Sequence, residues 1–260
     1  MDKLTILVFT CEAYSNLWEH NISFIYKNMP KSIVENIFLI TDKPHDSAFD
    51  KATLINANDN NDFIKRFMTG IQACQTNYFL LLLDDYFVTE INYQRFTTLL
   101  DYIQDNKIDY CKLYCRNKKY LIKNKPYYLL NTSFKYAVDL YPGIWNRSFA
   151  KSIVDEWNSD NRTIWHFEAN MCKQPRVINS KECICAINKE LCFLDVVRKG
   201  KMIRHSYRYL KKRNIKIEGL KKRSIWSAFK DHASVFLMHH TPSKIKTFIK
   251  KHAHKNSFEE

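Results

Sequence analysis

Two adjacent acids, Asp84 and Asp85, end the most apolar run of the chain, NYFLLLLDDYFV. After five apolar residues, neighbouring carboxylates are costly unless they are paired or bind a metal ion. Hard cations such as Mg²⁺ and Mn²⁺ prefer carboxylate oxygens, and they neutralise the charge of a diphosphate. In a purely structural alternative, one acid caps the following helix and the other is solvated. The pair therefore predicts either a metal–diphosphate site or a helix cap.

Polar groups also follow two other apolar runs that are typical of strands. LTILVF (residues 4–9) precedes Thr10-Cys11-Glu12, and NIFLI (residues 36–40) precedes Thr41-Asp42. In open α/β sheets, ligands bind outside the carboxyl ends of the strands. We therefore expect these groups and the two acids to meet at one edge of a sheet.

The elements that must position these groups alternate between strands and helices. The patterns predict strands over 4–9, 36–40, 54–55, the run NYFLLLL and 110–114, with helices near 15–28, 62–75 and 93–104. A β-rich aromatic stretch follows at 126–145, then helices near 148–157 and 164–172 and strands near 183–187 and 191–197. This order predicts an α/β fold with a mostly parallel sheet flanked by helices.

The composition excludes several kinds of site. The 260 residues are 45% hydrophobic, enough for one sizeable core, but only four are glycine. Neither a G-x-G-x-x-G fingerprint nor a G-x-x-x-x-G-K-[ST] loop can be written, which excludes an ordinary Rossmann site and a P-loop. We expect a cytoplasmic protein, because the sequence shows neither a signal peptide nor a membrane span. The eight cysteines favour buried thiols over disulfides or zinc ligands.

Positive charge is concentrated near the C-terminal end. Residues 198–255 hold 18 Lys/Arg against two acids (+16), whereas the remaining residues hold 23 Lys/Arg against 25 Asp/Glu (−2). Apolar residues within 222–239 and 243–253 predict amphipathic helices with a basic face. We expect the stretch 201–255 to bind an anionic membrane surface or a lipid-linked acceptor, or else to pack on the body of the protein. Nucleic acid is not an expected partner, because the sequence has no zinc-finger, RRM or KH pattern.

Several motifs, taken in order, resemble a known family. TCEAY after the first strand, ITD at the end of the second, Arg66 in a helix and LLLLDDYF together resemble the GT-A glycosyltransferases. More particularly, LDDYF, YPGIW (Tyr141–Trp145) and WHFE (Trp165–Glu168) resemble small bacterial glycosyltransferases of surface polysaccharide loci, which build capsules and lipopolysaccharides. The resemblance covers residues 4–205. It implies a GT-A-like (nucleotide-diphospho-sugar transferase) catalytic domain in 1–200, and we expect 201–260 to form a basic, amphipathic helical extension.

The resemblance implies a role for each of the polar strand ends. Thr10, Glu12 and Asp42 correspond to residues that hold the base and ribose of a nucleotide-sugar donor. Arg66 corresponds to a basic residue at the pyrophosphate, whose geometry a guanidinium matches.

Asp84 and Asp85 correspond to the D-x-D position, Asp84 near the ribose or metal and Asp85 as a ligand of Mn²⁺ or Mg²⁺. The usual motif spaces its acids by one residue, and here Tyr86 occupies the third place. This departure weakens the expectation of metal dependence.

Glu168 is the candidate catalytic base. An inverting transfer needs a carboxylate that takes the proton of the attacking hydroxyl, and a frame of Trp165 and Phe167 would raise its pKa by desolvation. The alternative is a surface glutamate on an amphipathic helix. His166 is a rival base, although adjacent helix residues point apart.

Aromatic and basic side chains complete the expected site. Tyr141, Trp145 and Trp165 offer flat faces for an acceptor sugar, with aromatic core as the alternative. Lys199, Lys201 and Arg204 around Gly200 are expected to close on the diphosphate, unless they form a solvated turn.

The sequence thus predicts an inverting glycosyltransferase that uses a nucleotide-sugar, UDP-linked by resemblance, and a saccharide or lipid-linked acceptor of surface polysaccharide biosynthesis. Two other functions stay open. One is a sugar nucleotidyltransferase, although TCEAYSNLW lacks the expected glycine-rich loop. The other is a polyanion- or membrane-binding protein that acts through its basic end.

Overall fold

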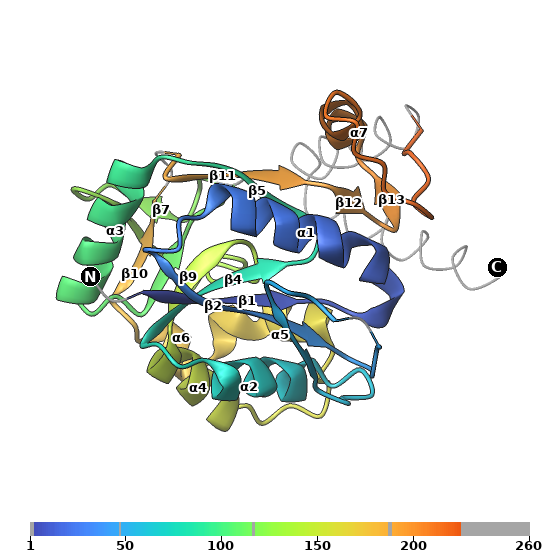
Figure 1. Cartoon of the computed structure of the whole chain (residues 1–260). Helices are drawn as coiled ribbons and strands as arrows, with labels where there is room; N and C mark the ends of the chain where they lie inside the picture. The colour runs from blue at the N-terminus through green and yellow to red at the C-terminus, as the bar shows by residue number, and fades with distance from the viewer. Residues whose placement is uncertain (1–2, 47, 116–117, 187–188, 225–260) are drawn as a thin grey trace, which may run out of the picture. The chain divides into compact units, whose positions relative to one another are not determined.

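The computed structural model describes residues 3–46, 48–115, 118–186 and 189–224 (Figure 1). The chain divides into two compact units. The first contains Met1–Val196 and Ile217–Gly219, and the second contains Val197–Lys216 and Leu220–Glu260. The division after Val196 puts residue 200, the expected boundary, inside the second unit.

A nine-stranded sheet forms the centre of the first unit as far as it is described, in the order β3-β2-β1-β4-β9-β6-β10-β8-β7. The strands are β1 (Leu4–Phe9), β2 (Val34–Thr41), β3 (Thr53–Asn56), β4 (Tyr78–Leu83), β6 (Tyr110–Lys112), β7 (Leu121–Ile122), β8 (Tyr128–Leu130), β9 (Gly143–Asn146) and β10 (Cys183–Cys185). Only β8 and β9 among these strands run against the common direction. The mostly parallel sheet that the sequence predicts is confirmed.

Helices cover both faces of the sheet (Figure 1). On one face lie α1 (Ser15–Asn28) and α3 (Tyr93–Asp105), and on the other lie α2 (Phe63–Ala73), α4 (Arg147–Asp155), α5 (Ile164–Asn170) and α6 (Pro175–Ile178). Two 3-10 turns, η1 (Glu12–Tyr14) and η2 (Met171–Lys173), also belong to this unit. None of the helices in the described part of the chain is long and apolar enough to cross a membrane.

The strands alternate between two hydrophobic cores, since successive side chains point to opposite faces. In β1, Leu7 and Phe9 pack toward α2 and α4, whereas Ile6 and Val8 pack toward α1 and α3. Burial on both faces explains why the central strands are continuous apolar runs rather than alternating ones.

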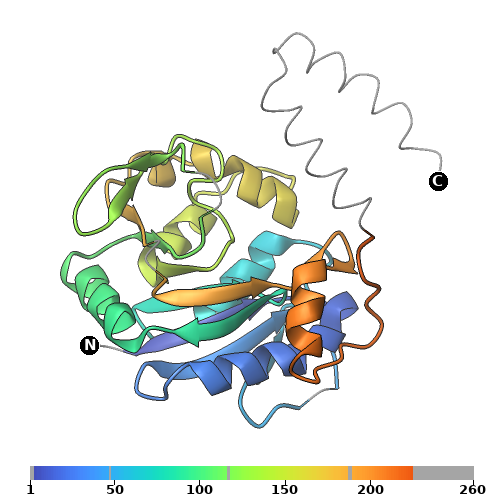
Figure 2. The ribbon, with the colours of Figure 1, turned by 90° about the horizontal axis from the view of Figure 1, so that it is seen from above.

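Strand β5 was not expected. β5 (Tyr86–Ile91) follows β4 after the two-residue turn Asp84-Asp85 and pairs antiparallel with β11 (Leu191–Asp195) in a separate ribbon (Figure 2). Helix α3 is capped by Asn92, whose side chain accepts the Arg95 N–H at 3.1 Å. The alternative in which one of the two acids caps the next helix is therefore wrong.

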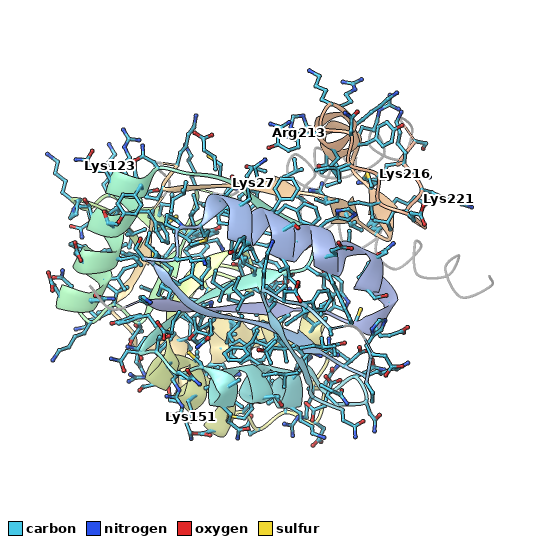
Figure 3. All side chains as sticks on the ribbon, viewed as in Figure 1. Lys27, Lys123, Lys151, Arg213, Lys216 and Lys221 are labelled. Carbon is cyan, nitrogen blue, oxygen red and sulfur yellow. The ribbon has the colours of Figure 1, made fainter. Side chains whose placement is uncertain are left out.

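The second unit begins with a hairpin of β12 (Val197–Arg198) and β13 (Lys201–Met202), followed by α7 (Arg204–Lys211). Lys199 and Gly200 both have positive φ (53° and 67°), as a two-residue hairpin turn requires. Basic side chains such as Arg213, Lys216 and Lys221 belong to this unit (Figure 3). Of the expected helices, 243–253 and all but the first three residues of 222–239 lie outside the described residues.

Candidate active site

The polar strand ends meet at one edge of the sheet, as expected. Phe9 pairs with both Ile40 and Leu83, so the residues that follow β1, β2 and β4 lie side by side. Strand β9 runs the opposite way, and its first residue, Gly143, pairs with Lys112 at the end of β6. The segment before β9 therefore reaches the same edge as the carboxyl ends of the parallel strands.

Thr10 and Asp84 are joined directly. The Thr10 hydroxyl donates to the Asp84 carboxylate, and Trp18 Nε1 donates to Thr10 Oγ1 at 2.6 Å. Asp84 is buried, and this burial raises its pKa to about 7, against the opposing effect of the Thr10 hydrogen bond. A carboxyl group that titrates near neutrality at a strand end is typical of functional sites.

The backbone carbonyl groups of Asp84, Asp85 and Tyr86 accept hydrogen bonds that hold the acidic turn in place. Asn21 Nδ2 donates to the carbonyl oxygens of Asp84 and Tyr86, each at 3.0 Å, and Val196 N–H donates to the carbonyl of Asp85 at 2.8 Å. Asn21 is fully buried on α1. Asn21 was not predicted as a functional residue, although an asparagine on the apolar face of a predicted helix is a signal that the sequence shows.

The two acids can supply only part of the coordination shell of a divalent cation. Within the described residues, no group of three or more His, Cys, Asp or Glu side chains could by itself hold a metal ion. Mg²⁺ commonly takes one or two carboxylates and completes its shell with water and phosphate oxygens. The Asp84–Asp85 pair therefore suits a cation that arrives with a diphosphate, not an all-protein cage.

Arg66 connects the loops at this edge through hydrogen bonds. Its guanidinium binds Asp59 through Nε (2.5 Å) and Nη2 (3.0 Å), and Nη1 donates to the carbonyl of Thr10 at 2.7 Å. Nη2 also lies 4.0 Å from Asp42 Oδ2, and Asp42 Oδ1 accepts the N–H of the exposed Glu12 at 2.8 Å. Arg66 is thus nearly buried and bound to Asp59, a partner that was not predicted. Its contact with a pyrophosphate stays a prediction.

A buried ion pair lies farther along the same edge. Lys112, at the end of β6, binds the carboxylate of Asp139, and both side chains are fully buried. Tyr110 donates its hydroxyl hydrogen to Asp139 Oδ1 at 3.3 Å. This pair was not predicted. The sequence does show a lysine within YCKLYC and an aspartate within AVDLYPGIW, and charges in such apolar surroundings must be paired if they are buried.

Glu168 lies next to this pair. It is half-buried on α5, and its Oε1 accepts the Leu140 N–H at 3.4 Å. Burial, followed by the negative charge of Asp139, raises the pKa of Glu168 to about 7. The rival base, His166, instead contacts Ser159 Oγ through Nε2 at 3.0 Å. Glu168 therefore has the properties of a general base at neutral pH.

A cluster of tyrosines joins the two parts of the edge. The rings of Tyr86, Tyr114 and Tyr141 lie with their centroids 5.6–5.7 Å apart. Tyr86 follows Asp85 directly, and the N–H of Tyr141 donates to Asp139 Oδ1 at 3.2 Å. The acidic turn and the Glu168 region are thus connected through a contact between aromatic rings.

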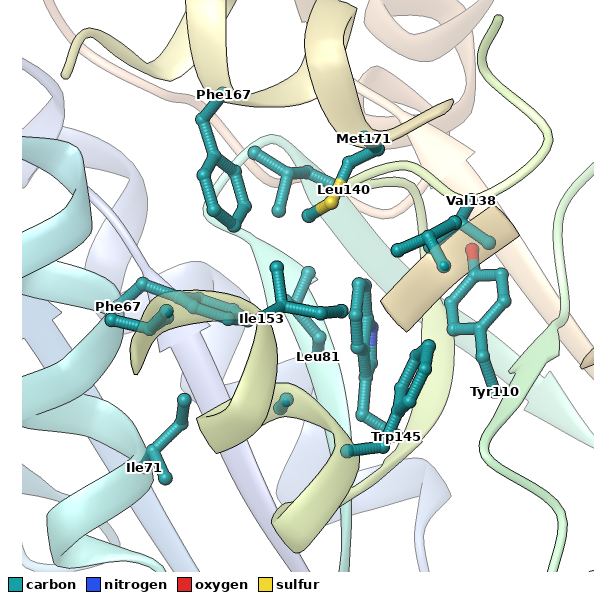
Figure 4. Packing of buried hydrophobic residues seen from close by; sticks show 14 of the residues in the cluster. Phe67, Ile71, Leu81, Tyr110, Val138, Leu140, Trp145, Ile153, Phe167 and Met171 are labelled. Carbon is teal, nitrogen blue, oxygen red and sulfur yellow. The ribbon is translucent and has the colours of Figure 1, made fainter. Parts of the chain in front are cut away.

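The two tryptophans expected at the acceptor have different environments. Trp165 is 78% exposed and precedes Glu168 by three residues on α5, so the two share a helix face. Trp145 is completely buried, with its ring 4.6 Å from that of Tyr110 and 5.8 Å from that of Phe67 (Figure 4). The prediction that Trp145 contacts a sugar is therefore wrong, because its faces are occupied by the core.

The basic residues expected at the diphosphate lie in the second unit. Lys199 is in the turn of the β12–β13 hairpin, Lys201 begins β13, and Arg204 is the first residue of α7. Their closure on a ligand stays a prediction.

These observations define the class of fold: the first unit is a GT-A-like α/β domain. No known protein family and no curated protein matches the chain in sequence. Among solved structures, it is similar to S. aureus TarS 1–349, with a TM-score of 0.50 and 12% identity over 74% of this chain and 60% of that chain.

The chain is equally similar to TarS 1–349 in complex with UDP-GlcNAc, with a TM-score of 0.50 and 12% identity over 77% of this chain. It spans about 60% of the length of both TarS chains. At this identity, the similarity establishes the fold.

Proposed function

We propose that the protein is a glycosyltransferase that moves a sugar from a nucleotide-sugar donor to an acceptor hydroxyl. One observation carries the proposal: a single edge of a GT-A-like sheet holds the Asp84–Asp85 turn and a half-buried carboxylate, Glu168, whose pKa is about 7. The two regions are linked by the ring contact between Tyr86 and Tyr141. Donor binding and proton abstraction are the two tasks that such a transfer requires.

The donor side comprises Thr10, Glu12, Asp42 and Arg66 with the acidic turn. We propose that Asp42 and Glu12 contact the base and ribose, and that Arg66 orients the loops while its remaining N–H groups face the pyrophosphate. UDP is the proposed nucleotide, and it is supported by the similarity to a TarS structure that contains UDP-GlcNAc.

Asp85, with Asp84 beside it, is the proposed holder of Mn²⁺ or Mg²⁺. When bound, such an ion would neutralise the charge that develops on the diphosphate leaving group. The hydrogen bonds from Asn21 and Val196 to the turn keep Asp85 in place for this role.

Glu168 is the proposed catalytic base of an inverting transfer. The acceptor oxygen bonds to the anomeric carbon, its proton passes to the Glu168 carboxylate, and the bond from the anomeric carbon to the diphosphate breaks. The nucleoside diphosphate leaves with the bonding electron pair. A base with a pKa near 7 is well matched to this step at neutral pH.

The acceptor side comprises the exposed face of Trp165 and the half-buried Tyr141. Flat aromatic faces suit the apolar face of a sugar ring. We propose a saccharide or lipid-linked acceptor of bacterial surface polysaccharide, such as a capsule or lipopolysaccharide. The reaction would take place on the cytoplasmic side, with residues 201–255 at an anionic membrane surface.

Nucleotide binding tests the donor side. In thermal unfolding with UDP, GDP, CMP or ADP, with and without Mn²⁺, one diphosphate should stabilise the protein in a metal-dependent way. A ligand at 100 times its Kd adds about 2.7 kcal/mol. Asp85→Asn should abolish this gain, whereas Asp101→Asn, an exposed aspartate of α3, should keep it. If no nucleotide stabilises the folded protein, the proposal fails and binding through the basic end becomes the better account.

Nucleotide release from a panel of sugar donors tests the catalytic side. Glu168→Gln should lower the rate about 10²–10⁴-fold without loss of nucleotide binding. The exposed Glu156→Gln serves as the matched control and should keep the full rate.

A further inference from the structure

The buried ion pair between Lys112 and Asp139 has no part in the chemistry described so far. Lys112 is 0% exposed and Asp139 is 1% exposed. Burying two charges costs free energy that their mutual attraction often fails to recover, so a buried pair is weak evidence for a role in stability.

The pair fixes the chain segment that contacts Glu168. Lys112 Nζ donates to the carbonyl oxygens of Tyr136 (2.9 Å) and Ala137 (3.4 Å), just before Asp139. Just after it, Asp139 Oδ1 accepts the N–H of Tyr141 at 3.2 Å. The residue enclosed by this last bond is Leu140, whose N–H donates to Glu168 Oε1 at 3.4 Å.

The charges that face Glu168 come from several elements. Asp139 precedes β9, Lys112 ends β6, and Lys135 lies in the loop between β8 and β9. Lys135 is exposed and its Nζ lies 5.0 Å from the Tyr136 ring, so solvent screens its charge more than that of Lys112. Apart from Lys135, the group thus contains the ammonium of Lys112 and the carboxyl groups of Asp139 and Glu168. Its net negative charge disappears when one proton is taken up.

Asp139 cannot itself receive the proton of an acceptor, because its side chain is enclosed and bonded to Lys112, Tyr110 and Tyr141. Glu168 is the member of the group that is partly accessible. Asp139 can therefore act on the reaction only through Glu168.

We propose that Asp139, paired with Lys112, is a positioning residue for Glu168: it holds the turn whose Leu140 N–H contacts the Glu168 carboxylate, and its own carboxyl group faces Glu168. During transfer, the acceptor proton goes to Glu168 while Asp139 stays paired with Lys112. The catalytic consequence rests on the proposed function, whereas the coupling between the two carboxyl groups does not.

The pH dependence of the rate tests the catalytic consequence. The acid limb of kcat/KM for nucleotide release follows the ionisation of Glu168. In Asp139→Asn, one negative charge is lost, so this limb should move to lower pH by about one unit. Asp155→Asn, in the exposed pair of Lys151 with Asp155, should leave the limb unmoved. An acid limb that stays in place in active Asp139→Asn overturns the proposal.

A second measurement does not depend on enzymatic activity, and it avoids a variant in which Lys112 is buried without its carboxylate partner. Glu168→Gln is made in the wild-type background and in the double variant Lys112→Met/Asp139→Asn, which buries no charge. In the wild-type background, Glu168→Gln should raise Tm more at pH 8 than at pH 5. In the double variant, this pH-dependent rise should be smaller, since the charge of Asp139 outweighs that of Lys112 at Glu168, but burial, the larger cause, keeps part of it.

An equal rise in both backgrounds overturns the proposal even if the protein transfers sugars. A reduced rise in a protein that releases nucleotide from no donor upholds the coupling and removes the proposed function.

Discussion

Replacing Glu168 by Gln should stabilise the protein at alkaline pH. Burial and the charge of Asp139 raise the pKa of Glu168 from 4.5 to about 7 in the folded protein. The folded state therefore holds the Glu168 proton more tightly than the unfolded chain does. The stability that this proton contributes is fully present below pH 4.5 and is lost as the pH rises through about 7. Gln resembles the protonated form at every pH and should avoid the loss.

The size of the effect follows from the pKa difference. At 1.36 kcal/mol per pKa unit, the free energy of unfolding gained by Glu168→Gln should grow from under about 1 kcal/mol at pH 5 to about 3 kcal/mol at pH 8. For a chain of this size, about 3 kcal/mol corresponds to a rise in Tm of roughly 6–12 °C. Partial solvent exposure of Glu168 makes these values upper estimates.

Urea unfolding at pH 5, 6.5 and 8 measures this gain directly. Glu156→Gln provides the matched control, because Glu156 is exposed at the end of α4, and its effect should stay within about 0.5 kcal/mol at each pH. A gain that does not grow with pH, or a loss of stability at pH 8, would refute the reasoning that burial and Asp139 make ionised Glu168 costly.

Three further substitutions test other parts of the site. Asn21→Leu leaves the carbonyls of Asp84 and Tyr86 without their donor, so it should lower the free energy of unfolding in urea by about 1–3 kcal/mol. It should also weaken metal-dependent nucleotide binding measured by calorimetry. An unchanged affinity would contradict a role for Asn21 at the turn. Trp165→Ala should leave stability within about 0.5 kcal/mol but raise KM for the acceptor, and an unchanged KM would remove Trp165 from the acceptor site. Trp145→Ala should cost about 3–5 kcal/mol of stability because it empties the core, and a mild effect on unfolding would contradict the burial of Trp145.

Much of the fold follows from local patterns in the sequence. The first strand (4–9) and the helix after it (15–28) were predicted with the bounds of β1 and α1, because continuous apolar runs and helical periodicity are local properties. The meeting of Thr10, Asp42 and Asp84 at one edge was also predictable, since parallel strands place their carboxyl ends together.

Other features depend on partners that are distant along the chain. β5 was missed because its pairing partner, β11, follows about a hundred residues later. Trp145 and Trp165 are the same residue type in similar aromatic surroundings, and only packing makes one a core residue and the other an exposed face. Lys112 and Asp139 are 27 residues apart, and the sequence does not show that they are a pair.

The sequence by itself determined the class of fold, the acidic strand end and Glu168 as a candidate base. Tertiary structure decided which aromatic faces are open, how Arg66 is held and why Glu168 binds a proton near neutral pH. The physical reason is that exposure and pKa depend on the groups packed around a side chain, and here these groups come from β6, the segment before β9 and α5.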